Sequence, residues 1–138
     1  LIPISRKPNP ESLDLDDTMT LSKAFMDLGN NIIIFPEGSR GEVGKIQRFR
    51  KGAVKFSMGL DVPILPAAIM GAEKAWPKGE KFIKPFPITV KVLPKIDPPK
   101  TKELSKTAYN KALSKITKDL EIKISEAVKE LKETKSPD

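Results

Sequence analysis

The sequence contains no cysteine and no histidine among its 138 residues. Without cysteine, the chain has no disulfide scaffold, no thiolate zinc site and no cysteine nucleophile. Without histidine, it lacks the commonest general base and the commonest metal ligand, so it holds no complete Ser-His-Asp or Cys-His site. We therefore expect this chain to supply no catalytic cysteine or histidine and no metal site.

Long apolar runs and a leader-like start are also lacking. The apolar runs 31–36 and 62–70 are far shorter than the roughly 20 residues that a membrane-spanning helix needs. No charged segment followed by an apolar one opens the chain, so no signal peptide is visible. Because Leu1 already lies in a strand-like segment, we expect the chain to be the later part of a longer polypeptide.

Basic residues, by contrast, are plentiful. The chain has 25 Lys and Arg against 18 Asp and Glu, a net charge of +7, with 38% hydrophobic residues, which is enough for one domain with a packed core. Such a charge favours an anionic partner, either a phosphate group, an acidic lipid surface or nucleic acid. Nucleic acid is not expected, because the few aromatic residues are not interleaved with the basic ones as a stacking platform.

The order of the predicted elements indicates an α/β domain. The run Ile32–Phe35 is continuously apolar, which is typical of a strand buried on both faces in a parallel sheet. We predict a mostly parallel sheet flanked by helices, N-terminally incomplete, and then a long C-terminal helical segment. The predicted elements are strands at Leu1–Ser5, Ile32–Phe35, Val62–Met70 and Phe86–Leu93, helices at Thr18–Leu28 and Lys51–Leu60, and one long helix or a pair of helices over Lys100–Lys135.

Two of these strands carry finer predictions. Pro66 interrupts Val62–Met70, so that strand is expected to bend or to lose pairing there. In Phe86–Leu93, Val90 and Val92 alternate with polar residues, which predicts a strand with one wet face.

Residues 100–138 are predicted to form a Lys-rich amphipathic helical tail behind a domain at residues 1–99. Three roles remain open for its apolar face: docking on its own domain, lying on an anionic membrane surface, or forming a coiled coil with a partner. The apolar residues recur every three or four positions, at Tyr109, Leu113, Ile116, Leu120, Ile124, Val128 and Leu131.

The segment Phe35–Arg40 carries the clearest chemical signal. A Gly-containing loop directly after a strand is where open α/β sheets build ligand sites. Gly38 permits a positive φ or a close backbone approach, Ser39 offers a hydroxyl, and Arg40 offers a planar fork of donors that Glu37 can orient. The expected ligand is a phosphate ester. The alternative is a tight turn in which the glutamate and the arginine neutralise each other.

The residues after this segment are strongly basic. Three of the four arginines lie between residues 40 and 50, although lysine dominates the chain as a whole. Arginine concentrated in this way suggests bidentate contacts to phosphate or to a lipid headgroup. The alternative is a solvated charged face.

Three segments, in this order, resemble motifs of the glycerophospholipid acyltransferases, which include the lysophosphatidic acid, glycerol-3-phosphate and lysophospholipid acyltransferases. The segments are Phe35–Arg40, Phe49–Ala53 and Val62–Gly71, and Ile4–Arg6 stands where the family has a strand ending in arginine. The resemblance runs from residue 1 to about residue 94. It makes residues 1–99 an incomplete acyltransferase α/β domain.

The resemblance implies transfer of a fatty acyl group from acyl-CoA or acyl-carrier protein to the hydroxyl of a lysophospholipid or glycerol phosphate, with no other cofactor. In the family, the histidine of a His-x4-Asp motif deprotonates that hydroxyl. This motif is absent here. We expect it upstream of Leu1, and we expect the chain as given to hold the acceptor-phosphate site without being active. The alternative is a non-catalytic module that binds phosphate or anionic lipid.

The resemblance also assigns residues and a location. Ser39 replaces a commoner threonine and keeps the hydroxyl, whereas Gly41 stands where a serine is frequent, so the phosphate donors number one fewer. Membrane association on the cytoplasmic side is implied, with an anionic membrane surface as a further partner. The residues assigned to the acceptor phosphate are Arg6, Glu37, Gly38, Ser39 and Arg40, and those expected elsewhere in the substrate site are Lys51, Val62, Pro63 and Pro66.

Overall fold

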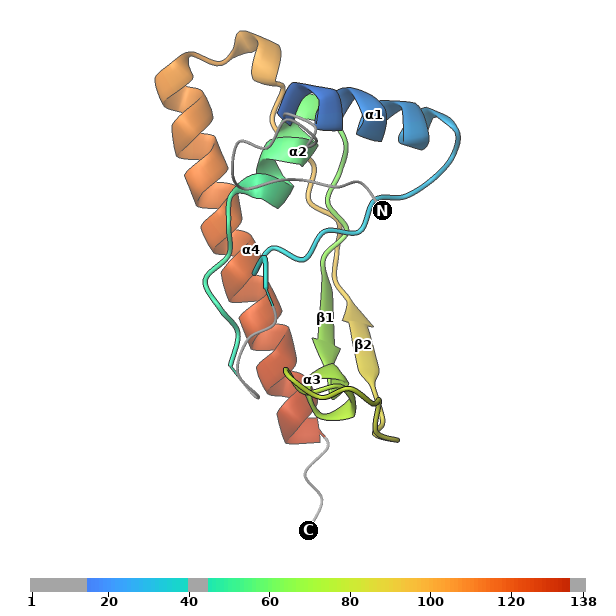
Figure 1. Ribbon diagram of the computed structural model, residues 1–138. Coiled ribbons are helices and arrows are strands. Elements are labelled where there is room, and N and C mark those ends of the chain that lie inside the picture. Colours follow the sequence, from blue (N-terminus) through green and yellow to red (C-terminus); the bar gives the residue numbers. More distant parts are fainter. Residues whose placement is uncertain (1–14, 40–44, 135–138) are drawn as a thin grey trace. The chain divides into compact units, whose positions relative to one another are not determined.

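The computed structural model describes residues 15–39 and 45–134 (Figure 1). The chain forms two compact units, residues 1–34 and residues 35–138. The strand predicted at Leu1–Ser5 and the site residues Arg6 and Arg40 lie outside the described residues. The division predicted between residues 99 and 100 stays a prediction.

In the first unit, helix α1 spans Leu15–Asp27, a slightly earlier start than predicted. Asp16 and Asp17 in its first turn stabilise the helix, because their negative charges interact favourably with the positive end of the helix dipole. The helix ends in a Schellman motif: the N–H of Gly29 (φ +82°) donates to the carbonyl of Met26 at 2.9 Å, and that of Asn30 donates to the carbonyl of Phe25 at 3.2 Å. The predicted stop at glycine and asparagine is therefore confirmed.

The buried strand predicted at Ile32–Phe35 is wrong for this structure. The segment forms no strand, and its side chains are largely accessible, with Ile33 82% and Phe35 68% exposed. A strand needs a neighbour whose N–H and C=O groups complete a ladder, and no described residue pairs with this segment. A continuous apolar run indicates a tendency to be buried but does not supply the neighbour.

The sheet of the second unit has two strands among the described residues, β1 (Ala67–Met70) and β2 (Thr89–Val92), and they are antiparallel. The predicted mostly parallel sheet is therefore wrong for this part of the chain. The physical reason is that residues 71–88 return the chain to the end of β1 that it left, and Gly71 packs so closely on the Pro87 carbonyl that a Cβ would lie 2.2 Å from its oxygen. The first residue of β2 thus pairs with the last residue of β1.

Pro66 explains why β1 is shorter than the predicted strand. Its carbonyl accepts a hydrogen bond from the Leu93 N–H at 2.9 Å, but proline has no N–H to return. The ladder resumes on the other side only as an isolated bridge between Ile64 and Ile96. The predicted loss of pairing at this proline is confirmed.

Helices form the rest of the second unit. Helix α2 spans Gly52–Leu60, within one residue of its prediction, and α3 is a single turn at Ala72–Ala75. A short 3-10 helix at Thr101–Glu103 precedes α4, which spans Lys106–Thr134 as one helix of 29 residues. No helix among residues 15–39 and 45–134 has the length and apolar character to cross a bilayer.

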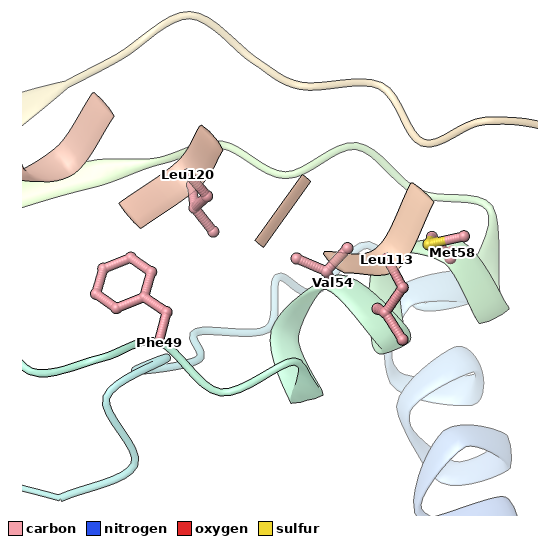
Figure 2. Close-up of a cluster of buried hydrophobic side chains, with 5 residues drawn as sticks. All are labelled: Phe49, Val54, Met58, Leu113 and Leu120. Carbon is pink, nitrogen blue, oxygen red and sulfur yellow. The ribbon is translucent and has the colours of Figure 1, made fainter. Parts of the chain in front are cut away.

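The core of the second unit lies between α2, α4 and the loop that leads into α2 (Figure 2). Val54 and Met58 are one turn apart on α2, and Leu113 and Leu120 are two turns apart on α4. Phe49 packs with them from the loop. The docked alternative for the apolar face of the tail is the one that the structure shows, and each buried side chain contributes roughly 1.5–3 kcal/mol.

Helix α4 also packs against β1, and this contact decides which face of the sheet is covered. Ala68 is fully buried, and its cross-strand neighbour Lys91 forms an ion pair with Glu130 of α4. Val90 and Val92 point the other way and are 56% and 59% exposed. The strand has one more exposed face, as predicted. The valines lie on that face, however, rather than the polar residues that alternate with them.

Candidate functional site

The segment Phe35–Gly38 is a β-turn. The Gly38 N–H donates to the Phe35 carbonyl at 3.0 Å, which closes the four-residue turn. Pro36 occupies the second position, where its fixed φ is favourable, and glycine occupies the fourth. The φ of Gly38 is +74°, so the predicted positive φ is present and a larger residue would be strained there.

Two hydrogen bonds join this turn to the loop before α2. The Arg50 N–H donates to the Pro36 carbonyl at 2.8 Å, and the Gln47 N–H donates to Glu37 Oε2 at 2.7 Å. The second bond is short because its acceptor is a carboxylate. Glu37 therefore has a structural role that the sequence did not reveal: it connects the turn to the basic segment that follows. Its predicted orientation of Arg40 stays a prediction.

These two hydrogen bonds bring positively charged side chains close to the turn. Ser39 is exposed at the end of the turn, and the side chains of Arg48, Arg50 and Lys51 are exposed along the loop that the turn contacts. Cationic groups and a hydroxyl next to a β-turn form a surface that favours an anion. The part of the candidate site that the structure describes is thus the turn together with residues 47–51.

Lys51 directly precedes α2 and also reaches α4. Its Nζ donates to Ser114 Oγ at 2.8 Å, which ties the start of α2 to α4. The ammonium group stays exposed, so it retains donors for a second partner.

The remaining predicted site residues lie beyond the other end of α2. The Val62 N–H donates to the Ser57 carbonyl at 3.1 Å, and its own carbonyl accepts from Ser57 Oγ at 2.5 Å. Pro63 is exposed, whereas Pro66 is buried beside β2. The nine residues of α2, about 14 Å of helix, separate Lys51 from Val62. The structure thus joins the Phe35–Gly38 turn to residues 47–51 through Pro36 and Glu37, and it leaves the Val62–Pro66 segment at a distance.

Sequence reasoning missed Glu121, which also holds this loop in place through a hydrogen bond. Its Oε2 accepts the Phe49 N–H at 2.7 Å across 72 residues of sequence. Glu121 directly follows Leu120 in the apolar stripe of α4, and a carboxylate at the edge of a buried stripe needs a partner. That was the available signal, but nothing in the sequence identified the loop as the partner.

The family model described as Acyltransferase matches residues 1–70. This match includes the turn at Phe35–Gly38 and most of the 62–71 motif. Among individual proteins, the chain is 42% identical over 67 residues to a 1-acyl-sn-glycerol-3-phosphate acyltransferase of Limnanthes douglasii, over 49% of this chain and 24% of that protein. It is 31% identical over 101 residues to one of Borreliella burgdorferi, over 73% of this chain and 39% of that protein.

A solved structure is similar as well. It is the crystal structure of PlsC, the 1-acyl-sn-glycerophosphate acyltransferase of Thermotoga maritima, with a TM-score of 0.56 and 26% identity, over 78% of this chain and 44% of that one. The chain therefore spans less than half the length of each of these three proteins.

Proposed function

The chain belongs to the acyltransferase family, and on that premise we propose that the protein transfers a fatty acyl group to the hydroxyl of 1-acyl-sn-glycerol-3-phosphate, which is lysophosphatidic acid. The relatives named above carry that acceptor in their names. The donor is a thioester, acyl-CoA or acyl-carrier protein, and no other cofactor takes part. The protein works at the cytoplasmic side of a membrane.

The turn that starts at Phe35 is the observation that carries this proposal. It lies within the family match, and the Glu37 carboxylate holds it on a loop with exposed Arg48 and Arg50. A phosphate monoester suits such a surface, because guanidinium groups form bidentate, charge-assisted hydrogen bonds with it.

Within this proposal, Arg6 and Arg40 bind the acceptor phosphate, and Gly38 and Ser39 bring the backbone and a hydroxyl to it. Lys51 adds a cation at the start of α2. Val62, Pro63 and Pro66 line the site further along, toward the acyl chains.

In the chemical step, a base takes the proton of the acceptor hydroxyl as its oxygen attacks the thioester carbonyl; the C–S bond then breaks, and the thiolate leaves and takes up a proton. The chain has no histidine to do this. We therefore expect the chain as given to bind lysophosphatidic acid without accelerating acyl transfer, and measurable transfer by this chain alone would contradict that assignment.

The absence of histidine also favours a second candidate function, a non-catalytic module that binds phosphate or anionic lipid. The two functions differ in the residues encoded before Leu1. An Asn-His-x4-Asp motif there would favour the enzyme, and a complete domain without it would favour the binding module.

Arg40→Ala tests the acceptor site. Loss of one charge-assisted phosphate contact is expected to weaken binding of lysophosphatidic acid by roughly 2–5 kcal/mol, measured by calorimetric titration of the monomeric, short-chain acceptor. Lys78→Ala removes one exposed cation from the excursion between β1 and β2 and serves as the control, with unchanged affinity expected. Equal affinities for the two variants would contradict the phosphate role.

A further inference from the structure

A shallow groove lies between the start of the loop that leads to α2 and the last turns of α4. Its volume is about 430 Å³, and it is widely open to solvent. It belongs entirely to the second unit, and Figure 1 shows residues 45–50 running beside α4. The residues that line it are Lys45, Ile46, Ser125, Val128, Lys129 and Lys132.

Both walls of the groove are held in place. The four α4 residues follow at spacings of three, four and seven from Ser125, so they share one face of the helix. The opposite wall is fixed because the N–H groups of Gln47 and Phe49 donate to Glu37 and Glu121, each at 2.7 Å. One wall is thus a continuous helix, and the other directly precedes a hydrogen-bonded loop.

The lining combines charge with an apolar floor. Among the residues that the structure describes, it includes three lysines, no carboxylate and the apolar side chains of Ile46 and Val128. All three lysines already have interactions within the chain, that of Lys129 being an ion pair with Glu133 at 3.9 Å. Their side chains are exposed, so these interactions are weak and exchange readily with another anion. An anionic group that carries an apolar neighbour complements this lining.

The apolar stripe of α4 is already in use. Leu113, Leu120 and Ala127 are buried within the unit, so most of the stripe is not available to lie in a bilayer. Contact with a membrane through α4 therefore relies mainly on its basic residues. In the described part of the chain, the lining of the groove contains no aromatic residue on which a nucleic-acid base would stack.

We propose that this groove binds the headgroup of an anionic phospholipid at a membrane surface. The ammonium groups of Lys45, Lys129 and Lys132 contact the phosphate, and Ile46 and Val128 contact the glycerol and the first carbons of the acyl chains. The groove differs in its residues from the proposed acceptor site, so this inference stands or fails separately from the proposed acyl transfer.

The test compares two triple variants of the full chain, each with three fewer positive charges. The groove variant is Lys45→Gln with Lys129→Gln and Lys132→Gln; the control carries Gln at three exposed lysines of the first half of α4, Lys106, Lys111 and Lys115. Glutamine preserves helix propensity in both. Binding is measured by co-sedimentation with phosphatidylcholine vesicles that contain phosphatidylglycerol, and circular dichroism verifies the fold.

At about fivefold per lysine near an anionic surface, the groove variant is expected to lose on the order of a hundredfold in vesicle affinity. The control is expected to lose only a few-fold, because its lysines lie at the other end of the helix. Arginine at the three groove positions is expected to retain binding, since the charge is preserved.

Equal losses in the two triple variants would overturn the proposal in favour of diffuse charge. Displacement from vesicles by glycerol 3-phosphate, but not by sulfate at equal ionic strength, would overturn it in favour of a soluble phosphate ester. Arg40→Ala is expected to weaken short-chain lysophosphatidic acid binding while leaving vesicle binding intact, and the groove variant is expected to do the reverse. The two proposals can therefore fail independently.

Discussion

The helical core of residues 35–138 and the two-stranded sheet beside it differ in how they use their apolar residues. In the core, Phe49, Val54, Met58, Leu113 and Leu120 are buried against one another. In the sheet, only the face toward α4 is covered, and the opposite face exposes Ile69, Val90 and Val92. The comparison shows that apolar side chains of similar size contribute very differently to stability, because only those with neighbours on all sides are removed from water.

A substitution in the helical core should give the largest loss of stability. Leu120→Ala removes a side chain that is only 3% exposed and leaves a cavity, so we expect a loss of about 3–5 kcal/mol in the free energy of unfolding. Val92→Ala on the open face of the sheet is expected to cost less than about 1 kcal/mol. Urea unfolding followed by circular dichroism measures both, and similar losses would mean that the open face is covered in solution.

A substitution at the start of the connection between β1 and β2 should give the next largest loss of stability. Gly71→Ala places a methyl group against the Pro87 carbonyl at a φ of +93°, so we expect a loss of about 2–4 kcal/mol from backbone strain and overpacking together.

Gly79 is a matched control, because its φ is also +93° but nothing lies within 4 Å of a built Cβ. Gly79→Ala is expected to cost only the strain, about 1–2 kcal/mol, in the same unfolding experiment. Two equal losses would show that the close approach to Pro87 relaxes at no cost.

The smallest of these effects concerns the connection between the core and the candidate site. Glu121→Ala leaves the part-buried Phe49 N–H without its carboxylate acceptor, so we expect a loss of about 1–3 kcal/mol. Glu126→Ala removes an exposed glutamate of the same helix and is expected to be nearly neutral. Amide hydrogen exchange at Phe49 checks the assignment: faster exchange is expected only in the Glu121 variant.

Local sequence signals predicted the helices and turns well. The spacing of apolar residues located α2 to within one residue and identified the tail as helical, and Gly29 with Asn30 ended α1 as expected. These features depend on residues within a few positions of one another, which a sequence displays directly. Strands were harder, because a strand exists only with a neighbour that the sequence does not name.

For the candidate site, the sequence supplied the residue types and the structure supplied their neighbours. The motif Phe35–Arg40 and the positive φ of Gly38 were predictable, since both follow from local chemistry. The bond from Gln47 to Glu37 was not predictable, nor was the bond from Phe49 to Glu121, because each joins residues by their position in space.

By itself, the sequence determined the family, the helical periodicity, the positive charge and the lack of any histidine or cysteine in this chain. The tertiary structure decided that most of the apolar stripe of α4 packs in the core and that the valines of β2 lie on the exposed face of the sheet. It also decided that a lysine-lined groove forms beside the loop. The physical reason is that the periodicity of a sequence shows which side chains share a face of an element, whereas only tertiary packing decides which other elements that face contacts.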